Sequence, residues 1–173
     1  MNLTIGGETK ALAEYLNEEL KDLEYADSNG GYSNCKFYSF EIPTKTRSNP
    51  NPVTPYAVIT PTQGYNKVVG NVHKSYVSLL IMILSTSPNP PDMETEEDCR
   101  EINTHVILQL ITAISQAIAR SPVYGDRYCV DVNQGLSWEL METENFPEKI
   151  GLIKLEVATT GANFEYQENE ITC

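Results

Sequence analysis

The stretch YVSLLIMIL, residues 76–84, decides the fold class that the sequence predicts. Its aromatic, β-branched and large aliphatic residues are typical of a β-strand. From residue 79 onward no polar residue alternates with the apolar ones, which indicates a strand that is buried on both faces. We expect one face to pack on helices of the same chain and the other face on a neighbouring subunit. The run is too short to cross a bilayer as a helix, which needs about 20 residues.

Two amphipathic helices flank this strand in the sequence. The first is predicted over 8–24, with Thr9 as its N-cap. Its apolar stripe is Leu12, Leu16, Leu20 and Leu23. The second is predicted to begin at Thr95, which with Asp98 resembles a capping box, and to end before Pro122. Its expected buried face is Ile102, Val106, Leu110, Ala113, Ile114 and Ala117.

Further strands are predicted before and after the second helix. Their ranges are 36–42, 56–60, 68–72, 128–132, 136–140 and 150–157, and 68–72 is either separate from 76–84 or continuous with it. Pro61 is expected to end the strand at 56–60, and Gly64 is expected to lie in a turn. The alternation of Leu136, Trp138 and Leu140 predicts a place for the indole ring in the core.

The strand at 36–42 is predicted to have two different faces. Tyr38, Phe40 and Ile42 are expected to share one face, with Phe37 on the other. The element order of helix, strands, helix and strands predicts an α+β fold. We expect two layers, a mostly antiparallel sheet with the two main helices packed on one face.

The chain is expected to form a single domain over 1–173, with an exposed loop at 43–55 and a frayed polar tail at 160–173. Pro50, Pro52 and Pro55 exclude a helix or a central strand from the loop. The loop also carries Lys45 and Arg47, two of the few basic residues.

The charge balance excludes several classes of partner. The chain has 24 acidic and 12 basic residues, a formal net charge of −12. Such a surface repels nucleic acids and anionic membranes, so we expect neither as a partner. The first residues have no basic segment and no long apolar run, and we therefore expect no signal peptide.

The sequence contains no recognisable catalytic or metal-binding motif. The cysteines are widely spaced, which predicts free thiols in a reducing cytoplasm; they are Cys35, Cys99, Cys129 and Cys173. His73 and His105 are the only histidines, and neither has further ligands at matched spacing. The acidic residues at 92–98 are typical of a helix N-terminus. We expect no enzyme activity, no cofactor and no metal.

Tyrosine is the commonest aromatic residue, with ten in the chain. Tyrosine tolerates half-burial and is enriched at interfaces, and ordinary strand packing explains the same residues equally well. The candidates for a binding surface are Tyr32, Tyr38, Tyr56, Tyr65 and Tyr76.

The order of these patterns resembles the tail terminator, or tail completion, proteins of long-tailed bacteriophages and phage-tail-like particles. The similar features are the helix at 11–23, the strand PYAVITP at 55–61, the strand at 76–84 and the long helix from 98 to 119. The most suggestive piece is LSWEL at 136–140, followed by Phe146-Pro147 and GLIKLEV at 151–157. The resemblance covers residues 8–160.

The resemblance implies a structural role in virion assembly. Such proteins form a ring, usually a hexamer, on the last ring of tail-tube subunits in the neck. The ring stops tube growth and offers a joining surface to the head connector, and in contractile particles it also contacts the sheath. The implied location is the host cytoplasm during assembly and then the virion.

We expect the loop at 43–55 to act as an arm that reaches a neighbour or the tube. The candidate assembly contacts are Lys45, Arg47, Tyr56 and Tyr76.

Three alternatives remain open at this point. The chain could be another neck or baseplate ring protein of the tail. It could be a small-molecule enzyme whose pocket forms between subunits. It could be a monomeric adaptor that binds peptide strands along a sheet edge.

Overall fold

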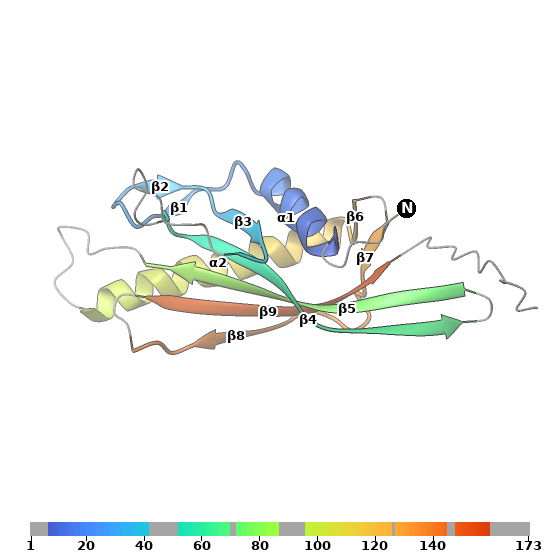
Figure 1. Ribbon diagram of the computed structural model, residues 1–173. Helices are drawn as coiled ribbons and strands as arrows, with labels where there is room; N and C mark the ends of the chain where they lie inside the picture. Colours follow the sequence, from blue (N-terminus) through green and yellow to red (C-terminus); the bar gives the residue numbers. More distant parts are fainter. Residues whose placement is uncertain are drawn as a thin grey trace, which may run out of the picture.

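The centre of the fold is a long β-hairpin with a third strand beside it. The computed structural model describes residues 7–41, 52–69, 72–86, 96–125, 127–144 and 148–159. Strand β4 (Tyr56–Val69) pairs antiparallel with β5 (Val72–Ser85), and β5 pairs antiparallel with β9 (Lys149–Thr159). Figure 1 shows these strands along the length of an elongated molecule.

Shorter strands complete the sheet on either side. Strand β3 (Lys36–Ser39) pairs with the start of β4, and this is the one parallel pair in the described sheet. At the other side, β8 (Ser137–Met141) pairs with the first half of β9, whereas β7 (Tyr128–Val130) pairs with its end. Strand β6 (Val123–Tyr124) pairs with β7, and β1 (Tyr25–Ala26) with β2 (Tyr32–Ser33) in a separate small sheet.

Both helices lie on the same side of the sheet. Figure 1 shows α1 (Gly7–Glu19) above the long strands, and α2 (Glu96–Arg120) rising from the level of the strands at the left to a position above them at the right. The core lies between these two layers and includes Leu16, Ile81, Leu110 and Ile153, all of which have 0% exposure. The predicted α+β fold, with two layers and a mostly antiparallel sheet, is confirmed.

Strand β4 is much longer than predicted. It continues through Pro61 and Gly64 to Val69, so the predicted strand end and turn are wrong. Strand β3 reaches only as far as Ile59, which leaves the outer edge of β4 unpaired at Pro61 in the described structure. A proline is tolerated at such an edge because no neighbour needs its missing N–H. The register shift between Pro61 and Gln63 is a β-bulge.

The two faces of the 79–84 run differ in the single chain. The predicted packing of one face on the helices is confirmed, and the predicted burial of the other face on a neighbouring subunit stays a prediction. Leu79, Ile81 and Ile83 are at most 1% exposed and face the helices. The alternate residues Leu80 and Met82 are only partly buried. A run without polar residues therefore still has a covered and an uncovered face, because the helices lie on one side only.

The first helix is shorter than predicted. It begins at Gly7 and ends at Glu19, so Thr9 lies within its first turn and is not the N-cap. Thr9 is fully buried, and its hydroxyl hydrogen-bonds with that of Ser39 at 2.6 Å. Leu20 is buried beyond the helix end, whereas Leu23 is 43% exposed, because the chain turns into β1 before the stripe is complete.

Phe37 and Tyr38 lie on opposite faces of β3, as predicted, but the strand ends at Ser39, before Phe40. Phe37 is 3% exposed and belongs to the core, Tyr38 is half-buried, and Phe40 is 46% exposed. Phe40 has a φ of 69°, which ends the extended strand after Ser39. Ile42 lies outside the described residues.

The second helix matches its prediction closely. The predicted buried face is confirmed for Val106, Leu110, Ile114 and Ala117, and Ile102 and Ala113 pack partly buried against the core. The capping residue Thr95 lies outside the described residues. Within the described chain, Glu97–Arg120 is the one helical segment that is long and apolar enough to cross a membrane, by length and composition alone. Half of its most apolar stretch is buried in the molecule, as in a core helix.

Candidate assembly surfaces

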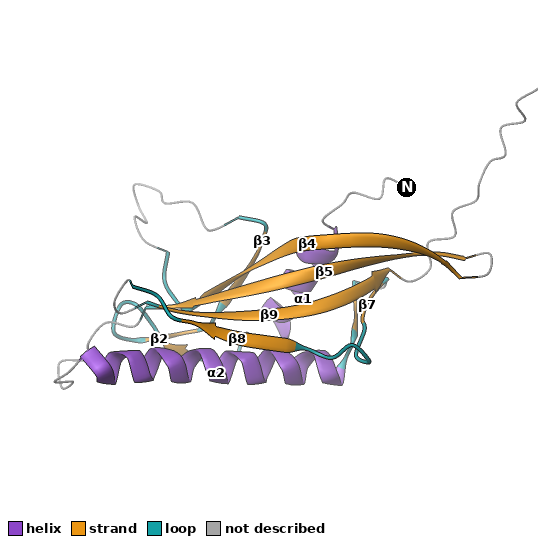
Figure 2. Cartoon of the chain, turned by 90° about the horizontal axis from the view of Figure 1, so that it is seen from below, coloured by secondary structure: helices purple, strands orange, loops and turns teal. Residues whose placement is uncertain are grey.

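The side of the sheet that faces away from the helices carries a row of aliphatic side chains, here called the outer stripe. Register partners share a face, and the pairs Met82↔Leu152 and Leu84↔Ile150 both point to this side. Leu80 lies next to them on β5, and every residue of the stripe is partly exposed. Figure 2 shows this face from below, with neither helix in front of it.

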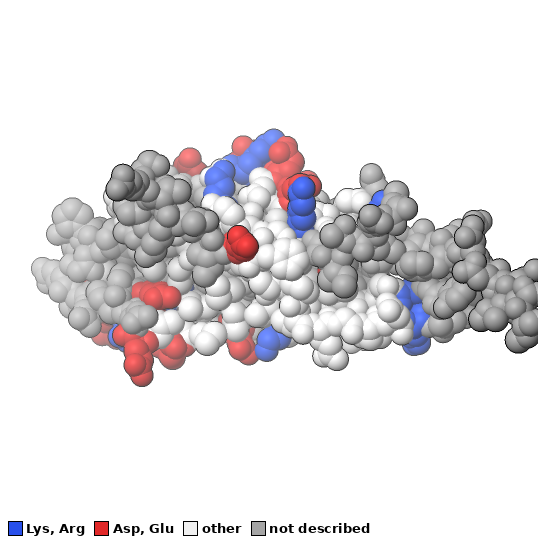
Figure 3. Space-filling model, viewed as in Figure 1, with Lys and Arg blue, Asp and Glu red and all other residues white. Residues whose placement is uncertain are grey.

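Charged residues border the outer stripe but do not interrupt it. The Lys154 ammonium lies 3.5 Å from a Glu139 carboxylate oxygen in an exposed ion pair across β8 and β9. Figure 3, viewed as in Figure 1, shows the side of the molecule and not the outer face; acidic side chains gather at its lower left, near the start of α2. The outer face therefore combines a row of aliphatic side chains with charged residues at its border, and an apolar area with a polar rim is a common arrangement at protein interfaces.

The hairpin of β4 and β5 extends beyond the rest of the sheet, and this extension (65–69 and 72–76) is here called the arm. The last partner of β9 on β5 is Tyr76, which pairs with Ala158. Beyond Tyr76 the two strands pair only with each other in the described structure, out to Val69↔Val72. Figure 1 shows the arm reaching past the end of β9. Two-stranded hairpins are marginally stable in water, so contact with a partner would stabilise an arm of this kind.

Tyr65 and Tyr76 stack at the base of the arm. They are register partners, and their ring centroids lie 5.0 Å apart with an interplanar angle of 12°. The Tyr65 hydroxyl donates to a Glu156 carboxylate oxygen at 3.2 Å. Desolvation, together with this hydrogen bond and the carboxylate charge, raises the pKa of Tyr65. Tyr76 lies on the outer side of the sheet, because it is an even number of residues from Met82 on β5. Its role as an assembly contact stays a prediction.

Two lysines lie directly opposite each other on the arm. Lys67 and Lys74 are register partners and both are exposed. They lie on the same side of the sheet as the outer stripe, because Lys74 is an even number of residues from Met82 on β5. Like charges directly opposite are destabilising in a sheet. Among the described residues, neither lysine forms an ion pair.

Of the other predicted assembly contacts, Tyr56 is buried, and the two basic residues are not among the described residues. Tyr56 is 5% exposed and its ring meets that of Tyr38 edge-on, so it has little surface to offer a partner. Burial, followed by the charge of Glu148, raises the pKa of the Tyr56 phenol. Lys45 and Arg47 lie outside the described residues.

Strand β8 is an edge of the sheet and carries the single tryptophan. In the described structure it pairs only with β9, which leaves its other edge free. Trp138 is 53% exposed, so its predicted place in the core is wrong. It faces the helix side with Ile153, yet β8 lies at the sheet's edge, where only part of the ring is covered. Met141, at the end of the strand, is 42% exposed.

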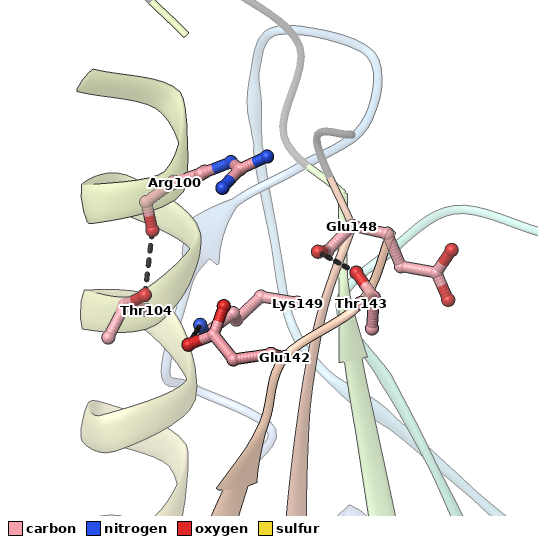
Figure 4. Close-up of polar contacts among 6 residues, drawn as sticks. All are labelled: Arg100, Thr104, Glu142, Thr143, Glu148 and Lys149. Carbon is pink, nitrogen blue, oxygen red and sulfur yellow. Dashed lines mark hydrogen bonds and ion pairs between the residues drawn. The ribbon is translucent and has the colours of Figure 1, made fainter. Parts of the chain in front are cut away.

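A polar cluster fixes the end of β8 to the beginning of β9. Lys149 is 8% exposed, and its ammonium donates to a Glu142 carboxylate oxygen at 2.8 Å (Figure 4). This hydrogen bond and the lysine charge lower the pKa of Glu142. The Thr143 hydroxyl donates to the Glu148 carbonyl at 2.6 Å. These contacts satisfy the buried lysine and hold the edge strand in place.

An open groove of about 580 Å³ lies between the segment at 23–25 and α2. His105 lines it and contacts Gln109, with 3.1 Å between the side-chain nitrogens. Within the described ranges, no group of three or more His, Cys, Asp or Glu residues has the arrangement of a metal site. Cys35, Cys99 and Cys129 are free thiols, and Cys173 lies outside those ranges.

The sequence analysis missed the two lysines of the arm and the exposure of Trp138. Lys67 and Lys74 are each three residues from Gly70-Asn71, and both residues of this dipeptide favour turns. The sequence therefore contains a signal for a hairpin that places the two lysines opposite each other. Pro61 and Gly64 obscure this hairpin signal, because they predict that the strand ends before it. The exposure of Trp138 had no local signal, since its alternation with leucines is that of a buried residue.

Comparison with known proteins does not place the chain in a family. No protein-family model matches the chain, and no curated protein matches it.

Proposed function

We propose that this chain is a structural, non-enzymatic subunit of a ring that closes the end of a phage-type tail tube. In this role it stops tube polymerisation and forms the joining surface for the head connector. The proposal combines the resemblance of residues 8–160 to tail terminator proteins with the surfaces described above.

The observation that carries the proposal is the outer stripe, which is partly exposed on the face of the sheet that points away from the helices. Leu80, Met82 and Leu152 are partly exposed on a face that neither helix crosses. Aliphatic residues in a continuous row are costly to leave in water, at about 25 cal/mol per Å² of apolar surface. An assembly subunit removes such a surface from water when it joins its partners.

The shape of the molecule also supports a ring. The arm lies on the β4 side of the sheet, and the free edge of β8 lies on the opposite side. A subunit with different surfaces at its two sides forms heterologous contacts, which close into a ring when the rotation between copies allows it. The partners proposed are further copies of the chain, the tail-tube protein, the head connector and, in a contractile tail, the sheath protein. The loop at 43–55, with Lys45 and Arg47, is proposed as a second arm toward one of these partners.

The test is the solution mass of the chain, alone and with its tail-tube protein, by size-exclusion chromatography with light scattering. The monomer has a mass of 19.3 kDa, so a closed hexamer has a mass of about 116 kDa. We expect a ring-sized species, or short tubes whose ends carry the protein in electron micrographs. A strict monomer that leaves tube growth unchanged would contradict the proposal.

A second candidate function is favoured by one observation, the free edge of β8. A monomeric adaptor could bind an extended peptide along this edge. Binding of extended peptides by a chain that never forms rings would support this function.

A further inference from the structure

The arm has few packing and pairing contacts with the rest of its own chain. In the described structure, the strands of the arm have no third strand beside them beyond Tyr76↔Ala158. The described side chains from 62 to 67 are all exposed, so the arm buries little surface of its own. A hairpin of this kind gains most of its stability when another strand or surface covers it.

The charge of the arm indicates an acidic partner. Lys67 and Lys74 face each other across the two strands, on the outer side of the sheet. The repulsion between them is relieved when a carboxylate approaches both. Lysines on an exposed edge also discourage pairing with unrelated strands. A strand that carries negative charge is therefore the one that can pair with the arm.

Strand β8 has the complementary properties. In the part of the chain that the structure describes, the free edge of β8 presents unpaired backbone groups, and the strand contains no proline or lysine that would block pairing. Glu139 lies on the outer side of the sheet, because it pairs in register with Leu152 of the outer stripe, and its ion pair with Lys154 of the same chain is exposed. Glu144 follows the strand and is exposed.

We propose that the arm of one copy adds to the free edge of β8 in a second copy, so that the lysine pair of the arm, Lys67 and Lys74, lies beside Glu139, with Glu144 farther along the same edge. The outer stripes of the two copies then continue into each other, since side chains on one face of a sheet stay on that face across a new strand pair. This inference rests on the proposed function, because it identifies the contact between copies in the ring.

A charge exchange between the two surfaces tests this contact. The arm variant carries K67E and K74E, and the edge variant carries E139K and E144K. Each variant alone places like charges against each other, and we expect at least about tenfold weaker self-association of the full-length chain in sedimentation velocity. An equimolar mixture is expected to regain the wild-type association, because every arm then meets an edge of opposite charge. Thermal unfolding of each variant checks that its fold is intact.

A matched control changes the same net charge elsewhere. Lys10 and Lys21 are exposed on and just after α1 and lie in intrachain ion pairs with Glu14 and Glu18. The double variant K10E/K21E is expected to associate as the wild type does. Wild-type association of the arm variant, or a mixture that stays dissociated, overturns the proposed contact.

Two measurements on the wild-type chain make the test independent of the variants. Trp138 is the single tryptophan and lies on β8, so association is expected to reduce the quenching of its fluorescence by acrylamide. A zero-length amine–carboxylate cross-linker, applied to a mixture of ¹⁵N-labelled and unlabelled chains, is expected to join Lys67 or Lys74 of one copy to Glu139 or Glu144 of another. A chain that stays monomeric at every concentration, and gives no mixed-label cross-link even on tube ends, overturns the contact.

The tube-capping assay separates this contact from the proposed function. Copies that associate through the arm but leave tube growth unchanged would refute the function and keep the contact. An arm variant that still caps tubes as hexameric rings would refute the contact and keep the function.

Discussion

At the scale of single residues, Gly151 sets how closely α2 approaches the sheet. It lies on β9 opposite Ile83, and an added Cβ would lie 2.4 Å from Cγ2 of Ile107. Ile107 has 0% exposure, and the same Cβ would also lie 3.6 Å from Cδ1 of Ile111. The absence of a side chain at residue 151 is therefore part of the packing between the two layers.

We expect Gly151→Ala to reduce the free energy of unfolding by about 1–3 kcal/mol, the usual cost of overpacking a core. For a chain of this size, that corresponds to a decrease in Tm of roughly 2–4 °C per kcal/mol. Thermal denaturation followed by circular dichroism measures this change. The control is Gly64→Ala, where the nearest atom to an added Cβ is a backbone oxygen at 3.4 Å. Equal Tm values for the two variants would contradict the close packing at Gly151.

The buried phenol of Tyr25 makes the stability of the fold depend on pH in the alkaline range. It is 6% exposed, and burial, followed by the proximity of Cys35, raises its pKa from 10.0 to about 12. The neutral phenol is therefore favoured in the folded state, and its contribution to stability is complete below pH 10. This contribution is lost as the pH increases from 10 to 12, because the unfolded chain ionises first.

We expect the wild type to lose stability more steeply than Tyr25→Phe between pH 10 and 12 in urea denaturation. In the folded state, the difference in absorbance at 295 nm between the two proteins should show a phenol that ionises near pH 12. Tyr32 is 74% exposed, and Tyr32→Phe is the control, with a pH dependence close to that of the wild type. Identical pH dependences for wild type and Tyr25→Phe would contradict the assignment.

At the scale of elements, a buried polar contact joins α2 to the end of β5. The Ser85 hydroxyl donates to the Asn103 side-chain oxygen at 2.8 Å, and the Asn103 amide donates to the Cys99 carbonyl at 3.0 Å. Both side chains have 0% exposure. Because a polar group at this depth requires a partner, the contact fixes the position of the helix along the strand.

We expect Asn103→Ala to cost about 1–3 kcal/mol of stability, since it leaves the Ser85 hydroxyl buried without this acceptor. The additional change Ser85→Ala should cost less in the Asn103→Ala background than in the wild type, which a double-mutant cycle in urea measures. Thr112 is exposed on the same helix, and Thr112→Ala is the matched control. Additive effects of the two buried changes would show that the contact does not couple them.

At the scale of the whole molecule, both helices and the long strands share one hydrophobic core. Leu12 and Leu16 of α1, Ile107 of α2 and Ile81 of β5 belong to the same buried cluster. The surfaces that this core leaves uncovered are the outer stripe, the arm and the free edge of β8. The molecule thus separates a helix-covered side, which holds the fold together, from a side that is available for assembly.

We therefore expect the monomer to unfold in a single cooperative transition. Far-ultraviolet circular dichroism reports on the helices and sheet, and tyrosine absorbance reports on side-chain packing. The two probes should give the same midpoint in urea. Two separated midpoints would indicate that part of the chain folds on its own core, against the predicted single domain.

The sequence alone determined the α+β class, the position of α2 and the presence of a strand at 76–84. These features depend on local periodicity: a stripe at three- and four-residue steps forms a helix, and a run of large aliphatics forms a strand. For the candidate surfaces, the sequence indicated Tyr76, but it also indicated Tyr56, which is buried. It gave no reason to distinguish the two, because both lie in strands of similar composition.

Only the tertiary structure decided which side of each strand is covered. Leu80 and Ile81 are equally apolar, and their different exposure follows from the position of the helices on one side of the sheet. The exposure of Trp138 follows from the edge position of β8, which depends on its pairing with β9. The length of the arm follows from the points where β3 and β9 end. Burial and pairing depend on elements that are distant in the sequence, and local patterns carry no information about them.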